Sequence, residues 1–281
     1  MGLSDWIKRH RWDLAFVDED WHFHFIRSPF KDRWFADPFI LSVSKDQVVL
    51  LVEEFAYSVG RGRIARLTVD RKSLVITDMQ IILDLDTHLS FPFIVRDAGK
   101  VLICPENSAS GHSTVYSYED ASRRAVPAAT VCDYPLTDAV SVCIGDAGFV
   151  LSTYIPNPNG KVLTVFAKGK DGRYSPMQEI VFDDYVARNA GAVLLRNGEL
   201  IRPSQICDGG FGYGLGIEFQ KLCFHEGRFS FEAVERRFPP EGYDGLHTYN
   251  ELDGIAVVDC RRYLRPVLRG ILHKIKELIV K

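Results

Sequence analysis

The sequence predicts an all-β fold, a five-bladed β-propeller, and two observations lead to it. A unit of roughly fifty residues recurs, with a polar residue in a short strand, an apolar run, a turn and a second apolar strand. Its polar markers are Asp37, Ser90, Asp138, Arg188 and His247, which are 53, 48, 50 and 59 residues apart. A chain of 281 residues is also long enough to form one large β domain. Because the innermost strands of a propeller surround one axis, the markers are expected to share one site.

The strands of each blade follow from alternating apolar residues and from turn signals. In the first unit we expect strands at 34–40, 47–54, 62–69 and 74–83. In the second we expect them at 91–95, 100–105, 113–118 and 128–132. The fifth unit has clear strands only at 246–250 and 254–258. An N-terminal strand at 12–17 is therefore predicted to complete the last blade and close the ring, which leaves no unpaired edge.

The C-terminal residues predict a long amphipathic helix. In 263–281 the apolar residues follow the spacing of one helix face, and the other face is basic. We therefore expect a propeller over residues 1–262 and a helix over 263–281. This helix would pack on or beside the propeller; the alternatives are contact with a membrane surface or with a partner protein.

Composition and charge exclude several classes of protein. The formal net charge of −3 gives no field that attracts nucleic acid. The sequence shows neither a secretory signal nor an apolar run of membrane-spanning length, which favours a cytoplasmic protein. The six cysteines are not spaced as zinc ligands, and the glycine-rich stretch at 209–214 does not open a helix. No metal or other cofactor is therefore expected.

Three acidic residues are the catalytic candidates. Asp37 lies among aromatic residues and before a proline, and a buried acid is costly unless it faces a polar cavity. It would act as a general base or nucleophile. Glu106 ends the second strand of the second blade and is the candidate acid, since cleavage of a glycosidic bond needs two carboxyl groups. Asp138, on the inner strand of the third blade, would change the pKa of a neighbouring acid by charge repulsion.

Further polar residues are candidates for substrate binding. Glu53 and Glu54 end the second strand, and because neighbouring strand residues point to opposite faces, one of them can face the ring mouth; Glu54 is the candidate. Arg188, Arg202 and Gln205 offer donors for hydroxyl, carboxylate or phosphate groups. His247 lies on the innermost strand of the fifth blade.

These motifs resemble those of known propellers. The stretch 36–38 is similar to the base or nucleophile motif of the five-bladed glycan-active superfamily, which includes glycoside hydrolase family 43, and Asp138 falls where that superfamily has an aspartate. Motifs from Asp37 to Thr248 together resemble the N-terminal propeller of glucosamine inositolphosphorylceramide transferases and its bacterial relatives. That resemblance adds His88 and Tyr213 to the substrate-binding candidates. It also implies a departure, since the hydrolases carry their acid at the start of blade four, where this chain has Arg188.

Two hypotheses for function follow. The first is a carbohydrate-active protein that acts at a glycosidic bond of an intracellular glycan, glycolipid or activated sugar, by hydrolysis or glycosyl transfer. The alternative is a non-catalytic module that binds a sugar or glycoconjugate and assists a separate glycosyltransferase. In both, the ligand is a carbohydrate and lies in the central pocket.

Overall fold

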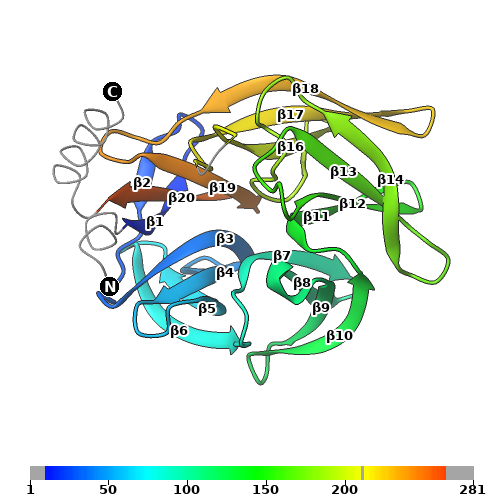
Figure 1. Cartoon of the computed structure of the whole chain (residues 1–281). Helices are drawn as coiled ribbons and strands as arrows, with labels where there is room; N and C mark the ends of the chain where they lie inside the picture. The colour runs from blue at the N-terminus through cyan, green and yellow to red at the C-terminus, as the bar shows by residue number, and fades with distance from the viewer. Residues whose placement is uncertain (1–9, 210–211, 264–281) are drawn as a thin grey trace, which may run out of the picture.

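The computed structural model describes residues 10–209 and 212–263, which form five antiparallel sheets of four strands around one axis (Figure 1). Blade 1 contains β3 (Arg33–Val43), β4 (Gln47–Ala56), β5 (Gly62–Asp70) and β6 (Val75–Leu83). Blade 2 contains β7 (Ser90–Asp97), β8 (Lys100–Glu106), β9 (Ser113–Glu119) and β10 (Arg124–Cys132), with a short 3-10 turn, Ser108–Ser110, before β9. The predicted five-bladed propeller is confirmed.

The remaining blades repeat this plan. Blade 3 contains β11 (Leu136–Ile144), β12 (Ala147–Tyr154), β13 (Val162–Lys168) and β14 (Tyr174–Val181). Blade 4 contains β15 (Leu194–Arg196), β16 (Glu199–Ile206), β17 (Gly216–His225) and β18 (Arg228–Arg237). Blade 5 combines both ends of the chain, with β19 (Gly245–Leu252), β20 (Ile255–Tyr263), β1 (His10–Val17) and β2 (Phe23–Phe25).

The ring closes through the N-terminal strands. β1 pairs with β20 over its whole length, from His10 opposite Tyr263 to Val17 opposite Ala256. β2 then pairs with β1 as the outermost strand. The sequence predicted closure by one N-terminal strand, and the structure uses two. This closure buries polar backbone groups that an incomplete blade would leave unpaired.

The innermost strands share a break in register near the axis. The breaks lie between Ala36 and Phe39, between Ser90 and Phe93, between Thr137 and Val140, and between Leu246 and Tyr249. In blades 1 to 3 the first residue of the break has a positive φ: 50° at Asp37, 43° at Phe91 and 47° at Asp138. A β-bulge of this kind turns a side chain away from the normal alternation.

Hydrogen bonds near these bulges join each blade to the next, and we call this ring the axial belt. Blades 1 and 2 are joined by Phe91 N, which donates to Asp37 Oδ2 (3.0 Å), and blades 2 and 3 by Asp138 N, which donates to Glu106 Oε2 (3.2 Å). Asn189 Nδ2 donates to the Asp138 carbonyl between blades 3 and 4 (2.7 Å), and Tyr249 N donates to the Ala190 carbonyl between blades 4 and 5 (2.7 Å). Asp37 N donates to Asp259 Oδ2 between blades 1 and 5 (2.8 Å). A buried amide without a partner would cost about 1–3 kcal/mol. The polar side chains at the axis therefore have a structural role as well as any chemical one.

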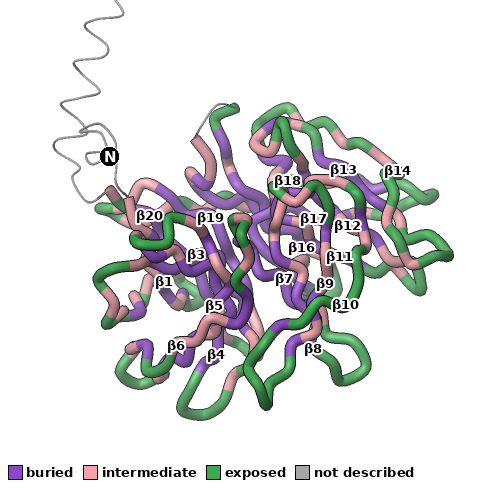
Figure 2. Tube along the Cα trace, turned by 60° about the horizontal axis from the view of Figure 1, so that its bottom comes forward, coloured by how far each residue is buried: buried purple, intermediate pink, exposed green. Residues whose placement is uncertain are grey.

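Apolar side chains between the blades form the core. Figure 2 shows buried residues along the inner strands and exposed residues mainly at turns and outer edges. Within the described ranges, no helix is long and apolar enough to cross a membrane. The helix predicted over 263–281 lies outside the described residues, apart from Tyr263, which ends β20. The division of the chain at residue 262 therefore stays a prediction.

Gly191 provides a test of the packing between blades 4 and 5. A Cβ atom there would lie 1.9 Å from the Tyr249 carbonyl oxygen, which is backbone and cannot rotate away. We expect Gly191→Ala to lower the free energy of unfolding by about 2–3 kcal/mol in urea denaturation. Gly198 also has a positive φ but open space around its Cβ position, so Gly198→Ala is the control and should cost about 1 kcal/mol. Equal losses would contradict the packing argument.

Candidate functional site

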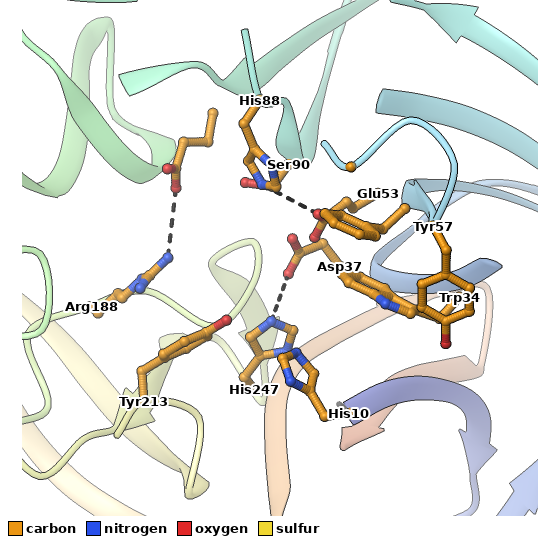
Figure 3. A pocket seen from close by; sticks show the side chains of 13 residues that line it. His10, Trp34, Asp37, Glu53, Tyr57, His88, Ser90, Arg188, Tyr213 and His247 are labelled. Atoms are coloured by element: carbon orange, nitrogen blue, oxygen red, sulfur yellow. Dashed lines mark ion pairs between the residues drawn. The ribbon is translucent and has the colours of Figure 1, made fainter. Parts of the chain in front are cut away.

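A cavity of about 640 Å³ opens at the end of the ring where the innermost strands begin (Figure 3). Its lining residues are His10, Trp34, Asp37, Glu53, Phe55, Tyr57, Gly60, His88, Ser90, Glu106, Arg188, Tyr213 and His247. Six of the ten residues expected at a site are among them, namely Asp37, His88, Glu106, Arg188, Tyr213 and His247. The expected convergence of inner-strand residues on one cavity therefore agrees with this geometry.

Asp37 is buried at the floor of the cavity and accepts bonds from two other blades. Its carboxylate accepts hydrogen bonds from the Phe91 amide (3.0 Å) and the Thr248 hydroxyl (2.8 Å). His247 Nε2 lies 3.3 Å from its Oδ1. Burial raises the pKa of Asp37 to about 6, although the nearby His247 opposes this shift. The group can therefore exchange a proton near neutral pH, as a general base requires.

His247 is held between two carboxylates. Its Nδ1 lies 2.7 Å from Asp259 Oδ1, and its Nε2 faces Asp37 (Figure 3). Trp12 stacks on the imidazole with ring centroids 3.8 Å apart. Burial lowers the pKa of His247, but the negative charges of Asp259 and Asp37 have the larger combined effect, so the net shift of this pKa is upward. A protonated His247 would help to keep Asp37 ionised.

Asp37, His247 and Asp259 are also close enough to hold a metal ion, since one ligand atom from each lies within 4.8 Å of the others. Both imidazole nitrogens already face carboxylate oxygens. Asp259 Oδ1 also accepts the backbone amides of His247 and Thr248. These mutual bonds satisfy the three groups without an ion. Asp259 was not among the sequence candidates, although an acid within the apolar run 255–260 was a usable signal.

Glu106 and Arg188 form the opposite wall, and Asp138 is buried behind them. Arg188 Nε donates to Asp138 Oδ2 at 2.6 Å, and Arg188 Nη2 lies 3.7 Å from Glu106 Oε2. Burial raises the pKa of Glu106 well above its usual value, and the neighbouring Asp138 adds to this shift, while Arg188 opposes it. This shift favours the protonated form of Glu106, which is the form that a general acid requires. Asp138 does not line the cavity, but it contacts both residues that do.

Glu53 is a third carboxyl group of the cavity, and the sequence candidate on this strand was Glu54. Glu53 pairs in register with Ala36, and its side chain lines the cavity. Glu54 points to the other face, where Arg33 and Arg63 bind its carboxylate. The choice of Glu54 as a cavity residue was wrong, because the alternation along β4 was read with the wrong parity.

Glu53 is buried, and one of its carboxyl oxygens has no hydrogen-bond partner among the described residues. Its Oε1 lacks a hydrogen-bond partner among the described residues, although His88 Nε2 lies 3.3 Å away at an unsuitable angle. Burial, followed by the charge of Asp37, raises the pKa of Glu53 well above its usual value. The Gly62 amide donates to His88 Nδ1 at 2.9 Å, so a neutral His88 carries its proton on Nε2, on the side of Glu53.

Arg202 and Gln205 lie beneath the cavity and do not line it. Arg202 donates to Asn189 Oδ1 at 2.7 Å and also to the Gln220 side chain and the Ala187 carbonyl. Burial lowers its pKa to about 9. Gln205 donates to Asp138 Oδ2 at 2.7 Å. This geometry does not support their expected direct contact with a substrate, because neither side chain lines the cavity and both donate to groups of the inner strands.

Aromatic residues complete the walls of the cavity. Trp34 and Phe55 are stacked with parallel rings, 4.9 Å between centroids. On the other side, the Arg188 guanidinium lies 4.9 Å from the centre of the Tyr213 ring. Trp34, Phe55 and Tyr57 were not predicted as site residues. Trp34 and Asp37 reach the same cavity only because the bulge shifts the alternation along β3.

The raised pKa of Glu53 predicts a stabilising substitution. A carboxyl group with a raised pKa contributes its full stability below about pH 4.5, and this contribution is lost as the pH rises through the raised value. Glu53→Gln is neutral at every pH. We expect it to raise the melting temperature at pH 8 by about 3 °C or more and to leave it unchanged at pH 4. Exposed Glu119→Gln is the control, and a gain for Glu53→Gln that is the same at both pH values would contradict the argument.

Comparison with known proteins gives both a family and a fold. Residues 18–239 match the family described as glucosamine inositolphosphorylceramide transferase 1, N-terminal. The chain is 25% identical over 206 residues to glucosamine inositolphosphorylceramide transferase 1 of Arabidopsis thaliana, which covers 70% of this chain and 26% of that protein. The chain thus spans about a quarter of the length of this curated relative.

Solved structures with low sequence identity share the fold. The exo-β-1,3-galactanase of Phanerochaete chrysosporium, with bound β-1,3-galactotriose, has a TM-score of 0.58 and 11% identity, covering 78% of this chain and 57% of that one. A family 43 β-xylosidase/α-arabinofuranosidase from a compost metagenome, with xylotriose, has a TM-score of 0.57 and 11% identity, covering 84% and 92%. The resemblance expected from the sequence is confirmed: the chain belongs to the glucosamine inositolphosphorylceramide transferase 1 N-terminal family.

Proposed function

We propose that the central cavity binds the sugar part of a glycan or glycoconjugate and acts at a glycosidic bond. One observation carries the proposal: carboxyl groups from two neighbouring blades, Asp37 and Glu106, line one cavity. Burial raises the pKa of Asp37 to about 6, and it raises the pKa of Glu106 well above its usual value. A pair of carboxyl groups, one ionised and one protonated, is what cleavage or formation of a glycosidic bond requires.

The roles follow from these states. Glu106 would donate its proton to the glycosidic oxygen as the bond from that oxygen to the anomeric carbon breaks. Asp37 would take the proton of a water molecule or an acceptor hydroxyl as its oxygen bonds to the anomeric carbon. Water gives hydrolysis and a hydroxyl gives transfer. Asp138 would act through Glu106 and Arg188, both of which it contacts.

The walls of the cavity also suit a sugar. Aromatic rings such as Trp34 and Tyr213 can pack against the apolar face of a pyranose, and the carboxyl groups and His88 can bind its hydroxyls. The galactanase and the xylosidase were solved with oligosaccharides bound. The name of the Arabidopsis relative contains both a sugar, glucosamine, and a lipid, inositolphosphorylceramide. The carbohydrate of the proposal is therefore one carried by a lipid or another conjugate, and we propose the cytoplasm as the compartment.

A binding module without catalysis is the second candidate, and Arg188 favours it. The resemblance to the hydrolases implies a glutamate at the start of blade four, and this position holds an arginine in an ion pair with Asp138. Such a module would present a sugar to a separate glycosyltransferase. In that case the carboxyl groups would only accept hydrogen bonds from, or donate them to, the hydroxyls of the ligand.

Two isosteric variants distinguish the candidates. Activity would be measured on a panel of nitrophenyl glycosides and sugar nucleotides, with sugar binding followed by calorimetry. If the site is catalytic, Asp37→Asn and Glu106→Gln each lower turnover about 100-fold or more, and the folded variants still bind sugar. Asp146→Asn, in the exposed turn at the far end of blade 3, is the control and should keep full activity.

Other outcomes lead to different conclusions. Sugar binding without turnover, retained in Asp37→Asn, supports the binding module. Turnover that survives both substitutions would rule out the assigned roles. A protein that binds no sugar, or that binds sugar equally well after Trp34→Ala, would contradict the placement of the ligand in this cavity.

A further inference from the structure

The central cavity is surrounded by more acidic than basic groups. Three carboxyl groups line it and two more are buried in contact with its lining residues, and these belong to Asp37, Glu53, Glu106, Asp138 and Asp259. Among the described residues that line the cavity, Arg188 is the one lysine or arginine. A carboxylate excess of this kind favours a positive charge in the space that it surrounds and opposes a negative one.

The basic groups of the wall are already paired with groups of the protein. Arg188 donates to Asp138 Oδ2 at 2.6 Å and to Asn159 Oδ1 at 2.9 Å, and its Nη2 lies 3.7 Å from Glu106 Oε2. Both ring nitrogens of His247 face carboxylates. An anionic group on a ligand would therefore have to compete with buried carboxylates for each of these partners.

Glu53 is the carboxyl group of the wall that has no basic partner. Its residue is 5% exposed, and Oε1 has no hydrogen-bond partner among the described residues. Burial lowers the pKa of the neighbouring His88, so this ring is neutral near pH 7 and brings no positive charge. After burial, the causes that raise the pKa of Glu53 are the charges of Asp37, Glu106, Asp259 and Asp138. A cation beside Glu53 would relieve this repulsion.

Aromatic rings lie on the same side of the cavity as Glu53. Phe55 is two residues further along β4 and therefore faces the same way, and its ring is stacked on that of Trp34. Figure 3 shows Glu53, Trp34 and Tyr57 on one side of the cavity and Arg188 on the other. A carboxylate next to aromatic faces is a combination that attracts an ammonium group.

We propose that the cavity selects sugars by their charge and that Glu53 is the residue responsible. A sugar with an ammonium group binds more tightly than the neutral sugar, and one with a carboxylate or phosphate is excluded. This inference rests on the proposed function, because it assumes that a sugar occupies the cavity.

The charge of the cavity also restricts the proposed reaction. Cleavage between Asp37 and Glu106 places the anomeric carbon next to both carboxyl groups. In a sugar nucleotide that carbon carries a phosphate, which has no available cation there. The donor in a transfer reaction is therefore a glycoside, and the phosphate of any lipid conjugate stays outside the cavity.

A matched series of sugars tests the selection. Glucose and galactose are each compared with their 6-amino-6-deoxy derivative, their uronic acid and their 1-phosphate, by calorimetry or ligand-observed NMR at about pH 7.5 and low ionic strength. We expect the amino derivative to bind about ten-fold more tightly than the parent sugar, and the two anionic derivatives to bind at least about ten-fold more weakly.

Glu53→Gln locates the selection, because it removes the charge and keeps the size of the side chain. This variant should bind the neutral sugar within about three-fold of the wild type and lose the preference for the amino derivative. It is expected to be at least as stable as the wild type, so a loss of preference does not reflect unfolding. Glu119→Gln removes one charge at an exposed position outside the cavity and should keep the preference.

Proton release provides a second measurement. The ammonium group takes the place of the proton on Glu53, which passes to the buffer, so the heat of binding depends on the ionisation enthalpy of the buffer. We expect this dependence for the amino derivative with the wild type. It should be absent for the neutral sugar and for Glu53→Gln.

The possible failures are distinguishable. If neutral sugars bind and their amino and anionic derivatives bind equally well, selection by charge is overturned and the proposed function stands. If the preference exists but survives Glu53→Gln, the role of Glu53 is overturned. If no member of either series binds, the proposed function and this inference fail together.

Discussion

The axial belt is the interaction on which the rest of the structure depends. Four of the five junctions use a side chain, from Asp37, Glu106, Asn189 or Asp259, and the backbone bond between Tyr249 and Ala190 closes the circle. Apolar side chains also pack between the blades, but apolar contacts have no preferred direction. Hydrogen bonds are directional, so the belt fixes the rotation of each blade about the axis. It thereby fixes the shape of the cavity directly above it.

The carboxyl groups at the site are buried at a cost in free energy. Asp37 and Glu53 are almost fully buried, and burial raises the pKa of both. The cost of burying them is partly offset at Asp37 by three donors and is not offset at Glu53 Oε1. A folded protein retains such groups when the surrounding structure is stable enough to hold them. The apolar core between the blades supplies that stability here, and the site has groups of high proton affinity as a result.

The fold could be predicted from the sequence because its signal is repeated. Five polar residues at similar spacings indicated the ring, and a short last unit indicated closure by the N-terminus. The identity of the site residues depends on the exact strand register and on the positions of the β-bulges, which the repeat does not give. The parity of Glu53 and Glu54 follows from the register of β4, and a single-residue error moves the side chain to the opposite face. The bulge at Asp37 reverses the alternation again. Asp259 and Arg202 could not be assigned from the sequence for another reason, which is that a charged residue in an apolar run can support a site without lining its cavity.

Closure by β1 has a consequence for the order of assembly. Asp13 pairs with Cys260, nearly the whole described chain apart, and Trp12 stacks on His247 in the finished ring. On the ribosome, β1 can pair with β2 early, but its other edge must wait for β20, so ring formation is a long-range event with a high contact order. Asp37 gains its contacts with His247, Thr248 and Asp259 at that moment. Asp37 therefore reaches its final environment only when the topology is complete, whereas Glu106, Asp138 and Arg188 can meet before the ring closes.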